Sequence, residues 1–229
     1  LVFIGVYANA QIVNIPDPVF KAKLLSASAS NQIASTEIPV YDQINNAWSA
    51  SSYNVIDTNN DGEIQVIEAQ TIKCLDFGGV IPGSIHDLTG IEAFSSLVAL
   101  KCRSNSIINL DVSGLISLMY LDCSGNQIQS LNILGLTNLQ SLNYSQNQIT
   151  SLDVSGLNNL QSLNCSQNQI TSLDVSGLTN LYELVCYNNQ LPSLDVSGLT
   201  NLQYLICSFN QLPSLDVSGL TNLQNLDCS

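Results

Sequence analysis

Positively charged residues are scarce in this chain. The 229 residues include 5 Lys and Arg against 18 Asp and Glu, which gives a formal net charge of −13 at pH 7, and no Lys or Arg follows Arg103. A surface of this sign repels phosphate backbones and anionic lipid headgroups. The composition therefore excludes nucleic acid as a partner. Beyond the first residues no apolar run is long enough to span a bilayer, so we expect no membrane insertion.

The residues that commonly carry catalysis or bind zinc are also few. The chain has one His, His86, and its 7 Cys form no C-x-x-C pair. Zinc sites need such pairs or clustered His, and no Gly-rich phosphate-binding loop occurs. We therefore predict a surface position for His86 and a protein that is not an enzyme.

An internal repeat dominates what the chain does contain. The sequence Leu-Asp-Val-Ser-Gly-Leu begins at Leu152, Leu173, Leu194 and Leu215, a period of 21 residues, with looser copies at Leu110 and Leu131. A fixed period of this length indicates a solenoid, in which each unit packs on its neighbours. The units match the leucine-rich-repeat pattern L-x-x-L-x-L-x-x-N/C-x-L. Over residues 95–229 we predict a leucine-rich-repeat solenoid with a parallel β-sheet on the concave face and an extended or irregular convex side.

Asn and Cys each recur in a fixed phase of the repeat. Buried Asn amides satisfy backbone groups where a strand turns, so we expect a structural ladder of Asn105, Asn126, Asn147, Asn168, Asn189 and Asn210. A parallel ladder of reduced, buried thiols is expected at Cys102, Cys123, Cys165, Cys186, Cys207 and Cys228, with Tyr144 in the missing place. Cys74 lies outside this phase and has no predicted role. The repeated Asp residues, as in Asp174-Val175-Ser176, are expected to form Asx turns, with weak cation binding along the convex side as the alternative.

The two ends of the chain differ from the repeats. Residues 1–10 are apolar and end in Ala8-Asn9-Ala10, which is typical of the end of a secretory signal peptide. Residues 11–94 are predicted to form a small helical N-terminal cap and an irregular first repeat, with Asp17-Pro18 starting a helix. Because the chain stops at Ser229 within an expected strand, we also expect C-terminal truncation.

One segment of the cap resembles a calcium site. Residues 57–68 fit the EF-hand loop pattern D-x-[DN]-x-[DN]-G-x5-E without a mismatch. Calcium takes about six to eight oxygen ligands, and the expected metal ligands are Asp57, Asn59, Asp61, Glu63 through its carbonyl, Gln65 and Glu68. Ile64 should point into the core, and residues 65–75 should form the exiting helix. The alternative is a metal-free Asp/Asn/Gly turn; because one loop has no partner loop, a bound Ca²⁺ would be structural.

The repeats resemble a known family. Residues 173–190 carry Leu-Asp-Val-Ser-Gly-Leu-Thr-Asn-Leu followed by the Cys and Asn positions, and with this motif residues 85–229 look like the internalin-like, cysteine-ladder subclass of bacterial leucine-rich-repeat proteins. The resemblance implies a secreted or cell-surface bacterial protein that binds host or matrix ligands.

The ligand surface is expected on the concave strand face. Ser and Asn fill its outward positions in the middle repeats, whereas later repeats place an apolar and aromatic group there. Such a group in a polar sheet is a candidate contact site, and its residues are Glu183, Val185, Tyr187, Tyr204 and Ile206, with Tyr120 in a second patch beside Lys101 and Arg103. Drift among repeats is the alternative explanation.

Three hypotheses for function follow. The first is an extracellular module that binds a protein ligand through the concave face. The second is carbohydrate binding, with Tyr187 and Tyr204 stacking on sugars beside the Asn and Ser rows. The third is a structural or spacer protein of the cell surface, whose activity lies in missing C-terminal domains.

Overall fold

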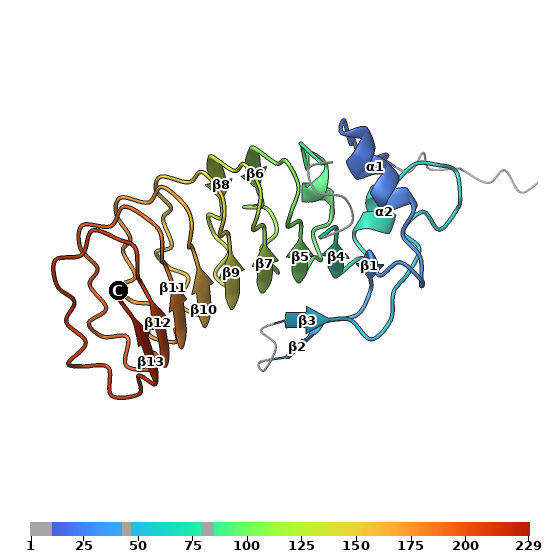
Figure 1. The fold of residues 1–229 in the computed structure, drawn as a ribbon. Coiled ribbons are helices and arrows are strands. Elements are labelled where there is room, and N and C mark those ends of the chain that lie inside the picture. The colour runs from blue at the N-terminus through green and yellow to red at the C-terminus, as the bar shows by residue number, and fades with distance from the viewer. Residues whose placement is uncertain (1–10, 43–46, 79–84) are drawn as a thin grey trace, which may run out of the picture.

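The computed structural model describes residues 11–42, 47–78 and 85–229, and these form an arc of stacked coils behind a small cap (Figure 1). One sheet runs along the inner side of the arc. Its strand order is β1-β4-β5-β7-β9-β10-β11-β12-β13. The bounds are β1 Ala34–Ser35, β4 Cys74–Asp76, β5 Ala99–Lys101, β7 Tyr120–Asp122, β9 Ser141–Asn143, β10 Ser162–Asn164, β11 Glu183–Val185, β12 Tyr204–Ile206 and β13 Asn225–Asp227.

Register follows the sequence repeat throughout this sheet. From β4 to β13 every pair is parallel, and Leu163 of β10 lies opposite Leu142 of β9 and Leu184 of β11. These three leucines are fully buried, because the middle residue of each strand points into the coil while its neighbours point outward. A stack of about seven such turns forms one continuous hydrophobic core. The predicted leucine-rich-repeat solenoid is confirmed.

The side of the coil away from the main sheet is mostly irregular. Two short parallel strands, β6 Asn109–Asp111 and β8 Ser130–Asn132, pair there and form a second sheet. In the later turns the same stretch has no strand. Its leucines and valines, such as Leu173 and Val175, still fill the coil from that side.

The cap begins with α1, Pro18–Leu25. Asp17 caps it as predicted, since Oδ1 accepts hydrogen bonds from the N–H groups of Val19 and Phe20 at 2.8 and 2.9 Å. Phe20 and Leu24 are fully buried, and the Phe20 ring packs edge-on against Phe77 with 5.3 Å between ring centroids. The cap also contains an antiparallel pair of strands, β2 (Val40–Asp42) and β3 (Ala47–Ser49).

The predicted helix over residues 65–75 is wrong in length. The helix α2 covers only Val66–Ala69, and the chain then turns into β4. The reason is tertiary: β4 pairs with β5 in register, Leu75 opposite Leu100, and both leucines are buried. The main sheet therefore starts inside the cap. A short 3₁₀ helix, η1 Ile91–Ala93, follows in the irregular first repeat.

Candidate functional site

The side chains that point outward from the middle strands are polar, and they form hydrogen bonds with polar groups two residues further along the same chain segment. Asn143 Oδ1 accepts hydrogen bonds from the Ser145 backbone N–H at 3.1 Å and from its hydroxyl at 2.8 Å. Asn164 bonds to Ser166 in the same way at 3.1 and 2.7 Å. These are Asx turns that end each strand. The amide oxygens of the rows are thus already used locally.

The rows change at β11 and β12. Glu183 lies opposite Tyr204 and Val185 lies opposite Ile206, which is the predicted adjacency. Tyr204 is 38% exposed and Ile206 is half-buried. The Ser162 hydroxyl donates to Glu183 Oε2 at 2.5 Å, so a neighbouring strand orients that carboxylate.

Tyr187 lies just past the end of β11. Its hydroxyl accepts a hydrogen bond from Gln167 Nε2 at 2.9 Å, and its side chain is half-buried. A Tyr here replaces the Ser that closes the Asx turn in the middle repeats. The hydrogen bond that orients Tyr187 therefore comes from the preceding turn of the solenoid, and not from an Asx turn at the end of β11.

Two of the six predicted ligand residues are covered. Val185 is only 8% exposed, since it lies between Asn164 and Ile206 on flanking strands whose longer side chains shield it. Tyr120 is 7% exposed and packs in a small cluster with Cys74 and Ala99. The expectation of an exposed side chain is wrong for both residues.

The cluster around Tyr120 shows where the cap meets the concave face. Ala50 and Tyr53, which follow β3, pack over the first strands of the sheet. Burial raises the pKa of the Tyr120 phenol, and its hydroxyl donates to Gln140 Oε1 at 3.1 Å. Lys101, assigned to the same patch, forms an ion pair with Asp76 at 3.4 Å. On β4, β5 and β7 one outward row is thus covered, Cys74, Ala99 and Tyr120, while the other stays half-buried.

Cys74 belongs to this covered surface. It lies opposite Ala99 in the outward row, and its thiol donates to the Glu37 carbonyl at 3.2 Å. Burial raises the pKa of Cys74 to about 12. The place that the thiol ladder would take beside β4 is filled by buried Phe77.

Sequence reasoning missed Phe209, whose side chain is 71% exposed. It follows β12 at φ 54°, a left-handed conformation that is unfavourable for a residue with a side chain. Gly125 occupies the same station with φ 63°. At this position of the repeat earlier units carry residues such as Gly or Gln, so the change to Phe could have identified Phe209 from the sequence.

The Asn ladder is built from hydrogen bonds between successive turns. Asn147 Nδ2 donates to the carbonyls of Tyr144 and Cys123 at 2.9 and 3.1 Å, and Oδ1 accepts from Ile128 N–H at 2.9 Å. The same pattern recurs at Asn126, Asn168, Asn189 and Asn210. Asn105 keeps the bonds to its own turn and accepts from Ile85 N–H.

A second row of asparagines was not predicted. On the outer surface each donates from Nδ2 to a carbonyl of the preceding turn at 2.7–3.0 Å: Asn138, Asn159, Asn180, Asn201 and Asn222. The sequence signal that could have predicted this row is the fixed place of each Asn in Leu-Thr-Asn-Leu, or Leu-Asn-Asn-Leu at residues 157–160.

None of the ladder cysteines forms a disulfide, and all but one of them are buried. Cys102, Cys123, Cys165, Cys186 and Cys207 are buried free thiols. Burial raises the pKa of Cys165 to about 12 and that of Cys207 to about 11. Cys228 is exposed, contrary to the expected buried ladder, because no strand covers β13 in the described chain.

The convex aspartates form the predicted Asx turns. Oδ1 of each accepts the N–H of the Ser two positions on at 2.8–3.0 Å, as at Asp111, Asp153, Asp174, Asp195 and Asp216. Hydrogen bonds from those serines hold the pKa of Asp174 and Asp195 below the usual value. These two carboxylates therefore stay ionised at neutral pH, and their hydrogen bonds stabilise the turns.

The segment 57–68 folds as a tight loop. Gly62 has φ 82°, its N–H donates to Asp57 Oδ2 at 3.0 Å, and Ile64 is fully buried as expected. Among the proposed ligands, Asp61 accepts hydrogen bonds from Glu63 N–H at 2.9 Å and from Gln65 Nε2 at 2.9 Å.

The fit of this loop to Ca²⁺ is partial. Glu68 turns to Thr58, accepting its N–H and hydroxyl at 2.7 Å. Asn59 donates to Asp61 Oδ2 and Gln65 Oε1, both at 3.0 Å. In residues 11–42, 47–78 and 85–229 no three Asp, Glu, His or Cys side chains converge on a possible metal position. The oxygen types and the turn suit Ca²⁺, whereas the side chains bond to one another.

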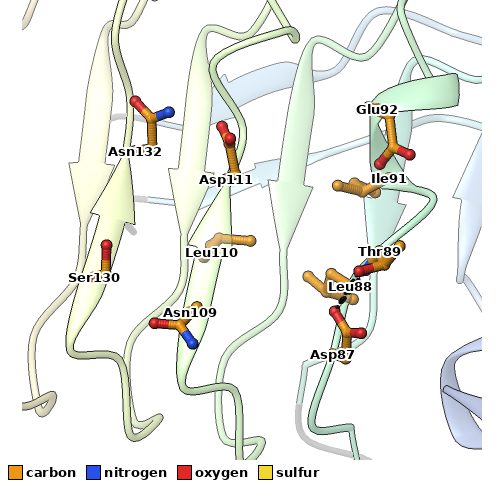
Figure 2. A pocket seen from close by; sticks show the side chains of 10 residues that line it. All are labelled: Asp87, Leu88, Thr89, Ile91, Glu92, Asn109, Leu110, Asp111, Ser130 and Asn132. Atoms are coloured by element: carbon orange, nitrogen blue, oxygen red, sulfur yellow. Dashed lines mark hydrogen bonds between the residues drawn. The ribbon is translucent and has the colours of Figure 1, made fainter. Parts of the chain in front are cut away.

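A hollow of about 370 Å³ opens between residues 87–92 and strands β6 and β8 (Figure 2). Its floor is aliphatic and buried, formed by Leu88, Ile91 and Leu110. Acidic residues on its rim bond locally: Asp111 to Ser113, and Glu92 to Gly90 N–H at 2.9 Å. The Thr89 hydroxyl in turn donates to Asp87 Oδ1 at 2.8 Å, so these rim carboxylates all bond to near neighbours in the chain.

The fold and its two buried ladders define the chain as a leucine-rich-repeat solenoid. Two overlapping stretches, residues 137–175 and 158–199, match the family model described as Leucine Rich repeats (2 copies). No curated protein sequence matches the chain significantly. None of the helices in the described ranges is long and apolar enough to cross a membrane.

Three solved structures are similar to this chain. The functional domain of InlJ from Listeria monocytogenes, which includes a cysteine ladder, is 32% identical with TM-score 0.52, covering 73% of this chain and 46% of that chain. A leucine-rich-repeat protein of Leptospira interrogans is 28% identical with TM-score 0.60, covering 72% and 50%. Internalin C2 of Listeria monocytogenes is 28% identical with TM-score 0.55, covering 71% and 83%. The chain thus spans about half the length of the first two structures.

Proposed function

We propose that this protein is an extracellular, non-enzymatic module that binds a protein ligand through the exposed concave strands β9–β13. The observation that carries the proposal is the change from self-bonded Asn and Ser rows to Glu183, Tyr204 and Ile206 in register on two adjacent strands. Aromatic and aliphatic side chains presented on a rigid sheet are typical anchors of protein interfaces.

Protein is favoured over carbohydrate as the ligand because of the polar rows. A sugar needs hydrogen-bonding groups that are open to it, whereas the amide oxygens of Asn143 and Asn164 already accept two bonds each. A secreted or cell-surface location in bacteria is part of the proposal. It rests on the resemblance to internalin-like repeats and on residues 1–10, which lie outside the described residues.

The test of this function is capture of proteins from host or matrix extracts by wild type and by matched variants. Tyr204→Ala and Ile206→Ser should each weaken capture, by about thirtyfold for a hot-spot aromatic. Asp195→Asn, on the opposite side of the coil, should leave it unchanged. If Asp195→Asn abolishes capture while the Tyr204 and Ile206 variants retain it, the concave face is the wrong surface. Binding on a glycan array that tracks Tyr204 would favour carbohydrate.

Structural Ca²⁺ binding in the cap is a second part of the proposal. It is supported by the unbroken twelve-residue pattern and by the turn at Gly62 that brings Asp57, Asn59 and Asp61 into one loop. A ligand that binds only the folded state at a hundredfold excess over Kd stabilises it by about 2.7 kcal/mol.

Melting temperatures in Ca²⁺ and in chelator test the calcium site. Calcium should raise the melting temperature, and Glu68→Gln should remove that increase. Glu63→Gln is the matched control, because the Glu63 side chain pairs with Lys21 at 2.6 Å and only its carbonyl is assigned to the metal. Equal melting temperatures for the wild type in both buffers would refute the site.

A further inference from the structure

The charge of the exposed concave strands specifies which protein segment fits them. Residues 104–229 contain no Lys, Arg or His, and their acidic residues are Asp111, Asp122, Asp153, Asp174, Glu183, Asp195, Asp216 and Asp227. Two of these, Glu183 and Asp227, lie on the concave face beside the aromatic and aliphatic pair. No side chain of opposite sign in that part of the chain offsets them.

The pairing of strands fixes how these groups are arranged. Tyr204 lies between Glu183 on β11 and Asn225 on β13, while Ile206 lies between Val185 and Asp227. Adjacent strands are about 4.8 Å apart and each residue rises about 3.3 Å. Glu183 and Asp227 are two strands apart and two residues out of register, so their Cα atoms are separated by roughly 12 Å, on opposite sides of the Tyr204 and Ile206 strand. The arrangement is an aromatic ring next to one carboxylate and an aliphatic side chain next to the other.

Both carboxylates are held in place by hydrogen bonds from serines. Glu183 accepts the Ser162 hydroxyl, and a carboxylate has room for several further donors. Asp227 accepts the Ser229 N–H and hydroxyl at 3.3 and 3.0 Å and the Ser208 hydroxyl at 3.2 Å. The backbone N–H and hydroxyl of Ser229 hold the pKa of Asp227 below its usual value.

We propose that β11–β13 bind a protein segment that carries arginine next to an apolar residue. The guanidinium lies over the Tyr204 ring and against the Glu183 carboxylate, and the apolar neighbour packs on Ile206. A planar guanidinium stacks on an aromatic face and bonds to a carboxylate at the same time, which an ammonium does less well. This inference rests on the proposed concave-face function and adds the chemistry of the partner.

Peptide binding measured by fluorescence anisotropy tests the inference. The probes are labelled acetyl-Gly-Arg-Ile-Arg-Gly-amide and two twins, in which lysine or neutral citrulline replaces arginine. The arginine peptide should bind at least about tenfold more tightly than the citrulline peptide and more tightly than the lysine peptide. Glu183→Gln and Tyr204→Leu should each reduce arginine-peptide affinity about five- to tenfold.

Asp195→Asn is the control, because it removes the same charge from the other side of the coil and should change affinity less than about twofold. Equal affinity for arginine and citrulline peptides, an equal effect of Asp195→Asn, or no arginine-peptide binding would overturn the inference. If captured proteins depend on Tyr204 and Ile206 but not on Glu183→Gln, the inference fails while the proposed function stands. If they depend on none of these residues, both fail. Unchanged melting temperatures of the variants exclude misfolding as the cause.

Discussion

A buried asparagine in each turn of the solenoid forms hydrogen bonds with backbone groups that have no other partner. Where the strand ends, carbonyls and N–H groups lose their sheet partners inside the core. The side chain of Asn147 bonds to groups of its own turn and of the preceding one. An unpaired buried donor or acceptor costs about 1–3 kcal/mol. This one side chain therefore makes a large contribution to the free energy of unfolding.

Asn147→Ala should reduce the free energy of unfolding by about 2–4 kcal/mol, because several buried groups lose their partner at once. Asn159→Ala is the comparison, since Asn159 is exposed and makes one bond, to the Thr137 carbonyl at 2.9 Å. It should cost about 1 kcal/mol or less. Urea denaturation of both variants provides the measurement. Equal losses would show that burial of the ladder amide is not what makes it important.

Tyr144 is the irregular member of the thiol ladder. Its hydroxyl is buried and makes no hydrogen bond of normal geometry among the described residues, and the weakly polar Cys165 thiol is the neighbour with which it interacts. Burial raises the pKa of the phenol well above its usual value. Tyr144→Phe should therefore be neutral or stabilise the fold by about 1 kcal/mol. Tyr144→Cys restores the ladder residue but leaves a cavity, and should cost about 3 kcal/mol. Urea denaturation would contradict this if Tyr144→Phe were strongly destabilising, since the hydroxyl would then have a partner.

At the scale of elements, one carboxylate joins the cap helix to the first repeat. Asp17 Oδ1 caps α1, while Oδ2 accepts the N–H groups of His86 and Asp87 at 2.8 and 3.1 Å. The helix end and a segment about seventy positions later in the chain thus share one side chain. Docking of α1 and formation of its cap are therefore coupled.

This coupling predicts a pH dependence. Burial alone would raise the pKa of Asp17, but hydrogen bonds from Phe20, His86, Asp87 and Val19 hold it below its usual value of 3.8. A lowered pKa in the folded state stabilises the fold above the unfolded-state pKa, and the contribution is lost as pH falls from about 4 through the folded value. Asp17→Asn should therefore be less stable than wild type at pH 6.

The difference between wild type and Asp17→Asn should shrink when urea denaturation is repeated at pH 3. Comparing the two proteins isolates Asp17, because the remaining carboxylates titrate in both. A difference that is the same at pH 3 and pH 6 would mean that the charge of Asp17 does not hold the cap.

At the scale of the whole molecule, stacking determines which thiols solvent can reach. Each ladder cysteine from Cys102 to Cys207 is covered by the turns on both sides, and Cys74 is covered by the cap. Raised thiol pKa values keep the nucleophilic thiolate rare at neutral pH. Cys228 in the last described turn lacks such cover.

Thiol labelling should therefore modify one cysteine quickly in the native protein, Cys228, and all 7 after denaturation. Peptide mapping by mass spectrometry identifies the labelled position. Rapid native labelling of Cys165 or Cys186 would show that the stack opens in its middle, and a disulfide between successive ladder positions would refute the reduced ladder.

The sequence alone determined the repeat, the strand register and the positions of both ladders. The reason is that a constant period of 21 residues places equivalent side chains at one station of every coil, so one unit predicts all the others. The Asp17 cap, the convex Asx turns and the adjacency of Glu183 with Tyr204 were equally predictable, because they depend on near neighbours or on that period.

Only the tertiary structure decided which of these side chains are accessible. Tyr120 is hidden by a cap segment distant in sequence, Val185 by its flanking strands, and Cys74 became an outward-row residue because β4 joins the sheet. The short helix α2 and the Asp17 contacts with residues 86–87 have the same origin. Exposure depends on what the folded chain places beside a residue, and periodicity carries no information about non-repeating neighbours.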